Sequence, residues 1–119
     1  MKIPFELLNG IILLDVSVNG KSGKMAFDTG AMQTCLNSRY FKDFKGERKE
    51  VSKFDGAVKT ETTVKGMCDM QCRDWNLTDL PVILLDMDYV EKPLKAVRSD
   101  LIFLGTMGID VIRSHKVLL

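Results

Sequence analysis

The tetrapeptide Asp28-Thr29-Gly30-Ala31 is the part of the sequence whose residue types could carry out chemistry. It follows the segment Lys24-Met25-Ala26-Phe27, so the carboxylate of Asp28 is expected to project from the end of a strand. Gly30 permits tight backbone geometry, and its amide could donate a hydrogen bond to the carboxylate. A rigidly held acid of this kind could act on a bound peptide. The alternative is that Asp28 only caps a turn through its side chain.

The residues before Asp28 predict a β-hairpin. Leu14, Val16 and Val18 alternate with polar residues, a period of two that is typical of a half-buried strand. Asn19-Gly20 then indicates a tight turn, and residues 24–27 return as a second strand. We therefore expect the hairpin to end at Asp28.

A second hairpin is predicted with its tip at Asp55, Gly56 and Ala57, because an Asp-Gly pair between two β-prone runs favours a short turn. Its arms are expected at residues 50–54 and 57–64. Residues 37–53 are polar and mixed in charge, and we expect a short helix or irregular segment there. Three aromatic residues would anchor that segment on the core: Tyr40, Phe41 and Phe44.

The second half of the chain predicts another strand pair, at residues 64–75 and 80–86, joined through residues 76–79. Pro81 suggests a sheet edge or a strand start. A short helix is expected at 89–97, then a buried strand at 101–104, and a helical turn over 109–114. Between the last two lies Thr106-Met107-Gly108, so both halves end in a glycine, but only the first half carries an acid.

Composition excludes several classes of function. With 119 residues and 45% hydrophobic residues, the chain is expected to form one domain over residues 1–119. The 17 basic and 16 acidic residues are interleaved, which argues against nucleic-acid binding. No apolar run approaches the roughly 20 residues that a membrane-spanning helix needs. The first ten residues lack the features of a secretory signal, although a trimmed exported precursor stays open.

Neither a metal nor another cofactor is expected. Three cysteines form no disulfide framework, which favours a reducing, cytoplasmic location. On one extended strand Cys68 and Cys72 would be about 13 Å apart, too far to share an ion, so buried or half-buried free thiols are expected. His115 lies among basic residues and is expected at an exposed helix end rather than as a catalytic base. Most methionines are expected to fill the core, although Met25, Met32 and Met107 could line a substrate pocket.

The order of these motifs resembles the retropepsins, and in particular the small bacterial, retroviral-type aspartic proteases. The resemblance covers nearly the whole chain, and its first and last motifs are the most specific. The matching segments are Asn19-Gly20, Phe27-Asp28-Thr29-Gly30-Ala31, Phe54-Asp55-Gly56-Ala57-Val58, residues 80–86 and residues 105–112. Thr106 and Met107 depart from the leucine or isoleucine that the family usually has before this glycine.

The resemblance implies an all-β, closed lobe with short helices and one active site per homodimer. It assigns catalysis to Asp28, support of the active site to Thr29, Gly30 and Ala31, and a flap that closes over a peptide to Asp55, Gly56 and Ala57. Met107, Gly108 and Ile109 correspond to the glycine motif of the second half. It also makes Asp110 a structural acid, and it implies that protomers pair through residues 1–5, residues 117–119 or both.

One independent observation agrees with a dimer, because the chain contains a single Asp-Thr/Ser-Gly motif and could not supply two such acids alone. The leading hypothesis is an aspartic endopeptidase that hydrolyses peptide bonds with a water molecule activated by two Asp28 carboxylates. The runner-up is a catalytically silent, dimeric peptide-binding module with the same fold. A third possibility is a monomer in which Asp28 is only structural.

Overall fold

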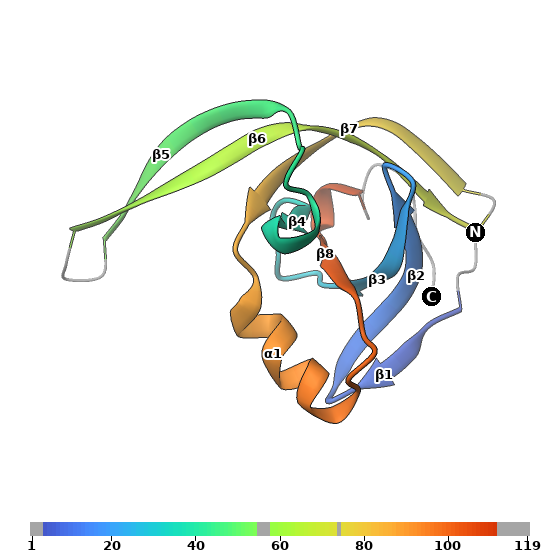
Figure 1. Ribbon diagram of the computed structural model, residues 1–119. Coiled ribbons are helices and arrows are strands. Elements are labelled where there is room, and N and C mark those ends of the chain that lie inside the picture. Colours follow the sequence, from blue (N-terminus) through green and yellow to red (C-terminus); the bar gives the residue numbers. More distant parts are fainter. Residues whose placement is uncertain (1–3, 55–57, 74, 112–119) are drawn as a thin grey trace.

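The computed structural model describes residues 4–54, 58–73 and 75–111 (Figure 1). The secondary structure of these residues is mostly β, with a few short helices. In chain order the elements are β1 (Glu6–Leu8), β2 (Ile11–Val18), β3 (Lys21–Phe27), β4 (Cys35–Asn37), the 3-10 helix η1 (Ser38–Tyr40), β5 (Gly46–Phe54), β6 (Val58–Cys72), β7 (Trp75–Leu85), α1 (Asp88–Val97) and β8 (Phe103–Met107).

The strands form one sheet that closes on itself. Its order is β1-β2-β3-β8-β4-β7-β6-β5, and a further pairing of β2 with β6 joins Ser17 to Gln71 and Val18 to Met70. The closed part therefore runs from β2 through β3, β8, β4, β7 and β6 back to β2. The predicted all-β, closed architecture with short helices is confirmed.

The hairpin of β2 and β3 matches its prediction. Asn19 and Gly20 have φ angles of 49° and 83°, the left-handed values that a two-residue hairpin turn requires. The pairing runs from Val18 opposite Lys21 to Leu13 opposite Ala26. The hairpin thus carries the chain to Asp28, one residue beyond the end of β3.

Side chains from the two faces of this sheet form two apolar clusters. Leu14, Val16 and Val18 point into the first, which fills the interior of the closed sheet. Leu13 and Ala26 point to the other face, where α1 covers them with Leu94. The alternation of the strands thus decides which cluster each residue joins, and α1 becomes fixed against the β2–β3 hairpin.

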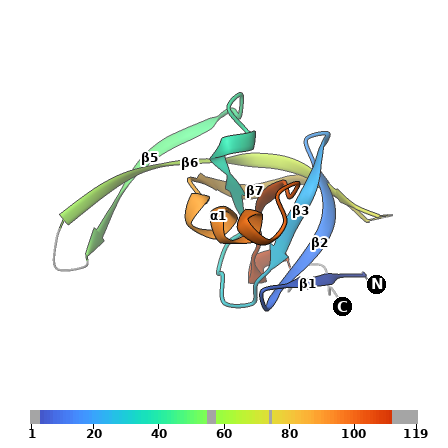
Figure 2. The same ribbon diagram turned by 60° about the horizontal axis from the view of Figure 1, so that its bottom comes forward.

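Strands β5 and β6 extend away from the closed sheet as a long two-stranded arm, which both Figure 1 and Figure 2 show. The predicted irregular segment is wrong for residues 46–49, because β5 begins at Gly46 and pairs with β6 over nine residues, whereas the arm predicted at residues 50–54 is part of β5. The arm is held by cross-strand backbone pairing, which a search for alternating apolar residues does not detect. The predicted tip, Asp55, Gly56 and Ala57, lies outside the described residues.

The predicted turn at residues 76–79 is also wrong, because these residues lie inside β7. Leu77 and Leu80 are buried on one face, and the polar residues between them are exposed. Asp79 has a φ of 53°, and the pairing with β6 shifts between Cys68 and Met70. The polar residues within 76–79 therefore belong to a β-bulge rather than to a chain reversal.

The helix predicted at 89–97 is confirmed as α1, whereas the last strand lies two residues later than expected. β8 spans Phe103–Met107 and is buried at every position, while Ile102 is partly exposed. A helical turn begins at Ile109. Strand β1 was missed, although Asn9-Gly10 between apolar pairs is a hairpin signal of the same kind as Asn19-Gly20.

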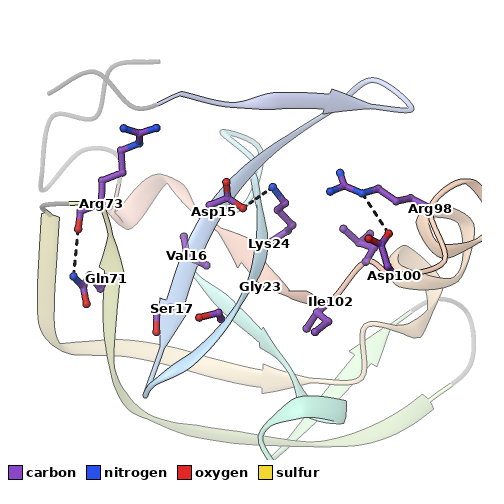
Figure 3. Close-up of a pocket in the computed structure, with 12 residues that line it drawn as sticks. Asp15, Val16, Ser17, Gly23, Lys24, Gln71, Arg73, Arg98, Asp100 and Ile102 are labelled. Atoms are coloured by element: carbon purple, nitrogen blue, oxygen red, sulfur yellow. Dashed lines mark hydrogen bonds and ion pairs between the residues drawn. The ribbon is translucent and has the colours of Figure 1, made fainter.

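An ion-pair cluster fastens β1 to the rest of the sheet. Lys24 Nζ lies 2.6 Å from Glu6 Oε1 and 2.5 Å from Asp15 Oδ1, and Arg98 Nη1 lies 2.7 Å from Glu6 Oε2. Figure 3 shows Lys24, Asp15, Arg98 and Asp100 around a cavity of about 530 Å³ on the β2–β3 hairpin. None of its lining residues belongs to the Asp28 segment.

Among the residues that the structure describes, no helix has both the length and the apolar character that crossing a membrane requires.

Candidate active site

Asp28 stands at the end of β3 with an exposed side chain. Its Oδ1 accepts a hydrogen bond of 2.9 Å from the amide of Gly30, the contact that the sequence suggested. Thr29 and Gly30 are exposed as well, and Ala31 is half-buried. The carboxylate is therefore oriented by its own loop and open to a ligand.

The two glycine-containing motifs lie side by side. β3 and β8 run parallel, with Phe27 opposite Met107, and the amide of Asp28 donates a hydrogen bond of 3.1 Å to the carbonyl oxygen of Met107. Further along, the amide of Ile109 donates one of 2.7 Å to the carbonyl oxygen of Ala31. The second motif therefore supports the backbone on both sides of Gly30.

Gly108 is needed because the loop after Asp28 crosses directly over it. A Cβ at this position would lie 2.6 Å from the carbonyl carbon of Gln33 and 3.0 Å from the carbonyl oxygen of Ala31. These neighbours are backbone atoms, which cannot rotate away as a flexible side chain can. The glycine of the second motif thus sets how closely the two segments approach.

Thr34, which sequence reasoning did not single out, links the two segments. Its buried Oγ1 accepts a hydrogen bond of 3.1 Å from the amide of Gly108 and donates one of 2.9 Å to Oδ1 of Asp110. The amide of Thr34 also donates to Oδ2 of Asp110 at 3.2 Å. Asp110 thus has the contacts of a structural acid. The only sequence signal for Thr34 was its place six residues after Asp28.

A cavity of about 450 Å³ opens beside Asp28. Among the described residues that line it, Asp28 is the only ionisable acid or base apart from the phenol of Tyr89. The others come from the β1–β2 turn and the start of β2, the end of β3, the start of α1 with the residue before it, and β8: Gly10, Ile11, Ile12, Ala26, Phe27, Met87, Val90 and Thr106. One exposed carboxylate therefore faces a largely apolar hollow.

The methionines proposed as pocket residues are placed differently. Met25 and Met107 are completely buried in the core, so the interpretation that they line a substrate pocket is wrong for both. Their neighbours along the strands, Ala26 and Thr106, face the cavity instead, because successive side chains of a strand point to opposite faces. Met32 is 83% exposed on the loop after Asp28.

The cysteines offer no alternative chemistry. Burial raises the pKa of the Cys68 thiol to about 12, and burial followed by the charge of Asp110 raises the pKa of Cys35. A thiol with a raised pKa is a poor nucleophile and a poor metal ligand. Within residues 4–54, 58–73 and 75–111 no group of three histidine, cysteine or acidic side chains could hold a metal ion. His115 lies outside the described part of the chain.

Two solved structures have the same fold. EIAV protease complexed with the inhibitor HBY-793 is similar with a TM-score of 0.58 and 13% identity, over 96% of each chain. A retropepsin-like aspartic protease from Rickettsia conorii is similar with a TM-score of 0.61 and 14% identity, over 95% of this chain and 84% of that one. At such low identity these likenesses establish the fold, which is retropepsin-like.

The assignment to a family comes from comparing the sequence with known proteins and family models. No curated protein matches the sequence significantly. The model of the aspartyl protease family, however, matches residues 14–111, a range that begins in β2, contains Asp28 and ends just after Asp110. This range covers most of the chain and includes both segments that build the site. The chain therefore belongs to the aspartyl protease family.

Proposed function

We propose that the chain is an aspartic endopeptidase that works as a homodimer, with Asp28 of each protomer forming one catalytic pair. The observation that carries the proposal is the environment of Asp28. Its side chain is exposed, it accepts a hydrogen bond from the Gly30 amide, and it is the only carboxylate among the described residues that line its cavity. Peptide hydrolysis by a water molecule that carboxyl groups activate needs two of them, one as acid and one as base. A second copy of the chain supplies the missing one by symmetry.

The reaction follows from placing two like carboxylates close together. Both cannot ionise easily at short distance, so the pair holds one proton between them. The ionised Asp28 removes a proton from a water molecule, whose oxygen attacks the scissile carbonyl carbon. The protonated Asp28 of the other protomer donates a hydrogen bond to the carbonyl oxygen. Transfer of a proton to the leaving nitrogen then breaks the carbon–nitrogen bond and releases an acid and an amine.

In this proposal the arm of β5 and β6 binds and covers the substrate. It projects from the closed sheet, and residues 46–54 and 58–66 pair with each other along its length (Figure 1). A two-stranded arm of this kind can close over an extended peptide, exclude water and offer main-chain hydrogen bonds. Asp55, Gly56 and Ala57, which lie between the two strands in the sequence, are the residues proposed to act as the flap.

The test is cleavage of a peptide library, at acidic and neutral pH, by the wild type, by Asp28→Asn and by Asp43→Asn. Asp43 is an exposed acid remote in sequence from the site, so its variant is the matched control. We expect Asp28→Asn to lose at least about 10³-fold in kcat/KM because an amide cannot serve as the base, and Asp43→Asn to keep wild-type activity. Equal activity of all three proteins would remove Asp28 from the mechanism.

The assembly is tested separately by measuring molar mass in solution at micromolar concentration. A dimer whose activity per chain falls on dilution supports the shared site. A protein that remains monomeric while it cleaves peptides would contradict it. A dimer that binds peptides but cleaves none across the pH range would instead indicate the alternative, a silent peptide-binding module.

A further inference from the structure

Another cavity lies at the tip of the β2–β3 hairpin, whereas Asp28 follows the other end of β3. Its volume is about 470 Å³, and its walls come from the hairpin tip, from η1 and from the residues between η1 and β5. From Lys21 to Asp28 the chain advances seven residues along β3, which corresponds to about 23 Å at about 3.3 Å per residue. This hairpin-tip cavity shares no lining residue with the cavity beside Asp28.

Basic side chains predominate around the hairpin-tip cavity. Lys21, Arg39 and Lys42 line it, and Asp43 is the one acid among the described residues that do so. Arg39 is already paired with two acids of α1. Within the described part of the chain, neither Lys21 nor Lys42 forms an ion pair. An anionic ligand would therefore meet two ammonium groups that lack a counter-ion.

The Lys21 ammonium is held in place although it lacks an acid. It donates a hydrogen bond of 2.6 Å to the carbonyl oxygen of Tyr40, and it lies 5.8 Å from the centroid of the Phe41 ring. At that distance the face of an aromatic ring attracts a cation. An ammonium group has three N–H donors, so two remain for a ligand. The group is thus oriented before a ligand arrives, which lowers the entropic cost of binding.

An apolar surface lies beside these cations. Phe41 is buried in the core, Phe44 is partly buried against the same cluster, and both residues line the cavity. The larger cavity of about 530 Å³ is different, because its Lys24 is paired with Asp15 and its Arg98 with an acid as well (Figure 3). The hairpin-tip cavity therefore combines unpaired ammonium groups with an aromatic surface.

We propose that the hairpin-tip cavity binds an acidic segment of the polypeptide substrate, remote from the bond that is cut. Glutamate or aspartate side chains of this segment pair with Lys21 and Lys42, and a neighbouring apolar side chain packs on Phe41 and Phe44. The volume lies within the range of roughly 300–1,000 Å³ that is common for ligand sites. Binding of the segment is independent of the proposed function, whereas its effect on cleavage rests on that function.

The test uses peptides that share one cleaved sequence and differ in an attached tripeptide, which is Glu-Leu-Glu, Gln-Leu-Gln or Lys-Leu-Lys. The tripeptide is placed about three or about ten residues from the scissile bond, on either side, because an extended peptide needs about seven residues to span about 23 Å. At the longer spacing we expect kcat/KM to be about 5-fold higher with Glu-Leu-Glu than with Gln-Leu-Gln, an effect of the size that two exposed ion pairs allow. At the shorter spacing the two should be equal. Peptides too short to reach the cavity report on Asp28 alone.

Lys42→Ala is the main variant, and Lys92→Ala, at an exposed lysine of α1 away from the cavity, is its matched control. We expect Lys42→Ala to lower the preference for Glu-Leu-Glu by about half or more, and Lys92→Ala to leave it unchanged. Lys42→Glu should reverse the preference in favour of Lys-Leu-Lys. The preference should also shrink as sodium chloride rises from about 0.05 M to about 0.5 M, because salt screens exposed charges.

Lys21→Gln removes the second charge and keeps an N–H donor for the carbonyl oxygen of Tyr40, so it should lower the preference as well. If Lys21→Gln unfolds, the Lys42 variants carry the test, because Lys42 is exposed and forms no ion pair within the described part of the chain. A preference of equal size at both spacings, or one that persists in Lys42→Glu, would overturn the proposed site.

Binding measured without turnover separates this inference from the proposed function. A Glu-Leu-Glu peptide without the cleaved sequence is titrated at millimolar concentration into Asp28→Asn protein, with and without Lys42→Ala, and Kd is read from NMR shifts. Binding that Lys42→Ala weakens, together with absence of cleavage of any peptide, would overturn the protease and keep the acid-binding site. Cleavage with equal kcat/KM for the Glu-Leu-Glu and Gln-Leu-Gln peptides would overturn the site and leave the protease standing. Absence of binding, or displacement of the peptide by an equal concentration of inorganic phosphate, would also overturn it.

Discussion

The carboxylate of Asp110 receives two hydrogen bonds from Thr34, one from its hydroxyl at 2.9 Å and one from its amide at 3.2 Å. The two residues are 76 positions apart in the sequence, so this contact joins the loop that follows Asp28 to the segment that follows β8. The same hydroxyl also accepts the amide hydrogen of Gly108. One buried side chain therefore sets the relative position of the two segments around the site.

Replacing Thr34 by valine is expected to damage both stability and activity. The change keeps the shape but removes the hydroxyl, which leaves the Gly108 amide without its acceptor at a cost of about 1–3 kcal/mol in the free energy of unfolding. We expect kcat to fall as well, because Asp28 would be held less rigidly. Urea denaturation and peptide cleavage measure the two effects. Thr34→Ser, which restores the hydroxyl, should recover most of both, and failure to do so would contradict the role of the hydrogen bonds.

Gly108→Ala tests the close approach of the two segments. Its Cβ would overlap the backbone of Gln33 and Ala31, so we expect a loss of about 2 kcal/mol or more in the free energy of unfolding. Gly30→Ala provides the contrast, because a Cβ there would meet only Oδ1 of Asp28, at 3.2 Å. Gly30→Ala should therefore affect cleavage more than stability. Equal stability of Gly108→Ala and the wild type in thermal denaturation would show that the loop can move aside.

Glu91→Leu is expected to cost about 3 kcal/mol in the free energy of unfolding, because it removes the acceptor of two donors: the buried amide of Phe103 and the partly buried hydroxyl of Tyr40. Burial and then the hydrogen bond to Glu91 raise the pKa of Tyr40 to about 12, so its hydroxyl keeps its proton and donates. Glu91→Gln retains an acceptor and should cost about 1 kcal/mol. The exposed neighbour variant Lys92→Ala is the control, and denaturation midpoints rank the three.

The attachment of β1 should weaken in acid. Hydrogen bonds from Lys24 first and Arg98 second hold the pKa of Glu6 below its ordinary value of 4.5. A depressed pKa means that the ionised form stabilises the fold above about pH 4.5, and that this contribution disappears as the pH falls through the lower, folded-state value. Since Glu6 is partly exposed, the contribution is about 1 kcal/mol or less.

The measurement is the free energy of unfolding of the wild type and Glu6→Gln from about pH 7 to about pH 3. The wild type should be more stable near neutrality, and the difference should shrink toward zero in acid. Glu47→Gln, at an exposed acid of β5, should show no such convergence. A difference that is constant with pH would mean that Glu6 acts through packing rather than charge.

Local signals in the sequence predicted the parts of this fold that local chemistry determines. Asn19-Gly20 located the β2–β3 hairpin, and with it the position of Asp28 at a strand end, because both residues adopt left-handed backbone angles there. The short helix expected at residues 89–97 is α1. Asp28, Gly30 and Gly108 were singled out from their types and from their places after apolar segments, and the structure brings their two segments together.

Other features depend on contacts between distant segments, which a single sequence does not display. The start of β5 at Gly46 depends on pairing with Gly66, and the bulge at Asp79 depends on its partners in β6. Thr34 can link the two segments only because the residues that follow β8, Gly108 and Asp110, lie beside it. The position of Tyr89 and Val90 beside the Asp28 cavity was equally hidden, since the sequence predicted the helix but not the cavity that it lines.

One strand, β6, belongs both to the projecting arm and to the interior. It pairs with β5 up to Gly66, and without interruption its far end pairs with β2 at Met70 and Gln71. A molecule that binds to the arm therefore contacts the same strand whose pairing with β2 closes the sheet. A ligand that binds the arm only when β6 is folded thus stabilises the whole closed sheet, and its binding should raise the melting temperature of the chain.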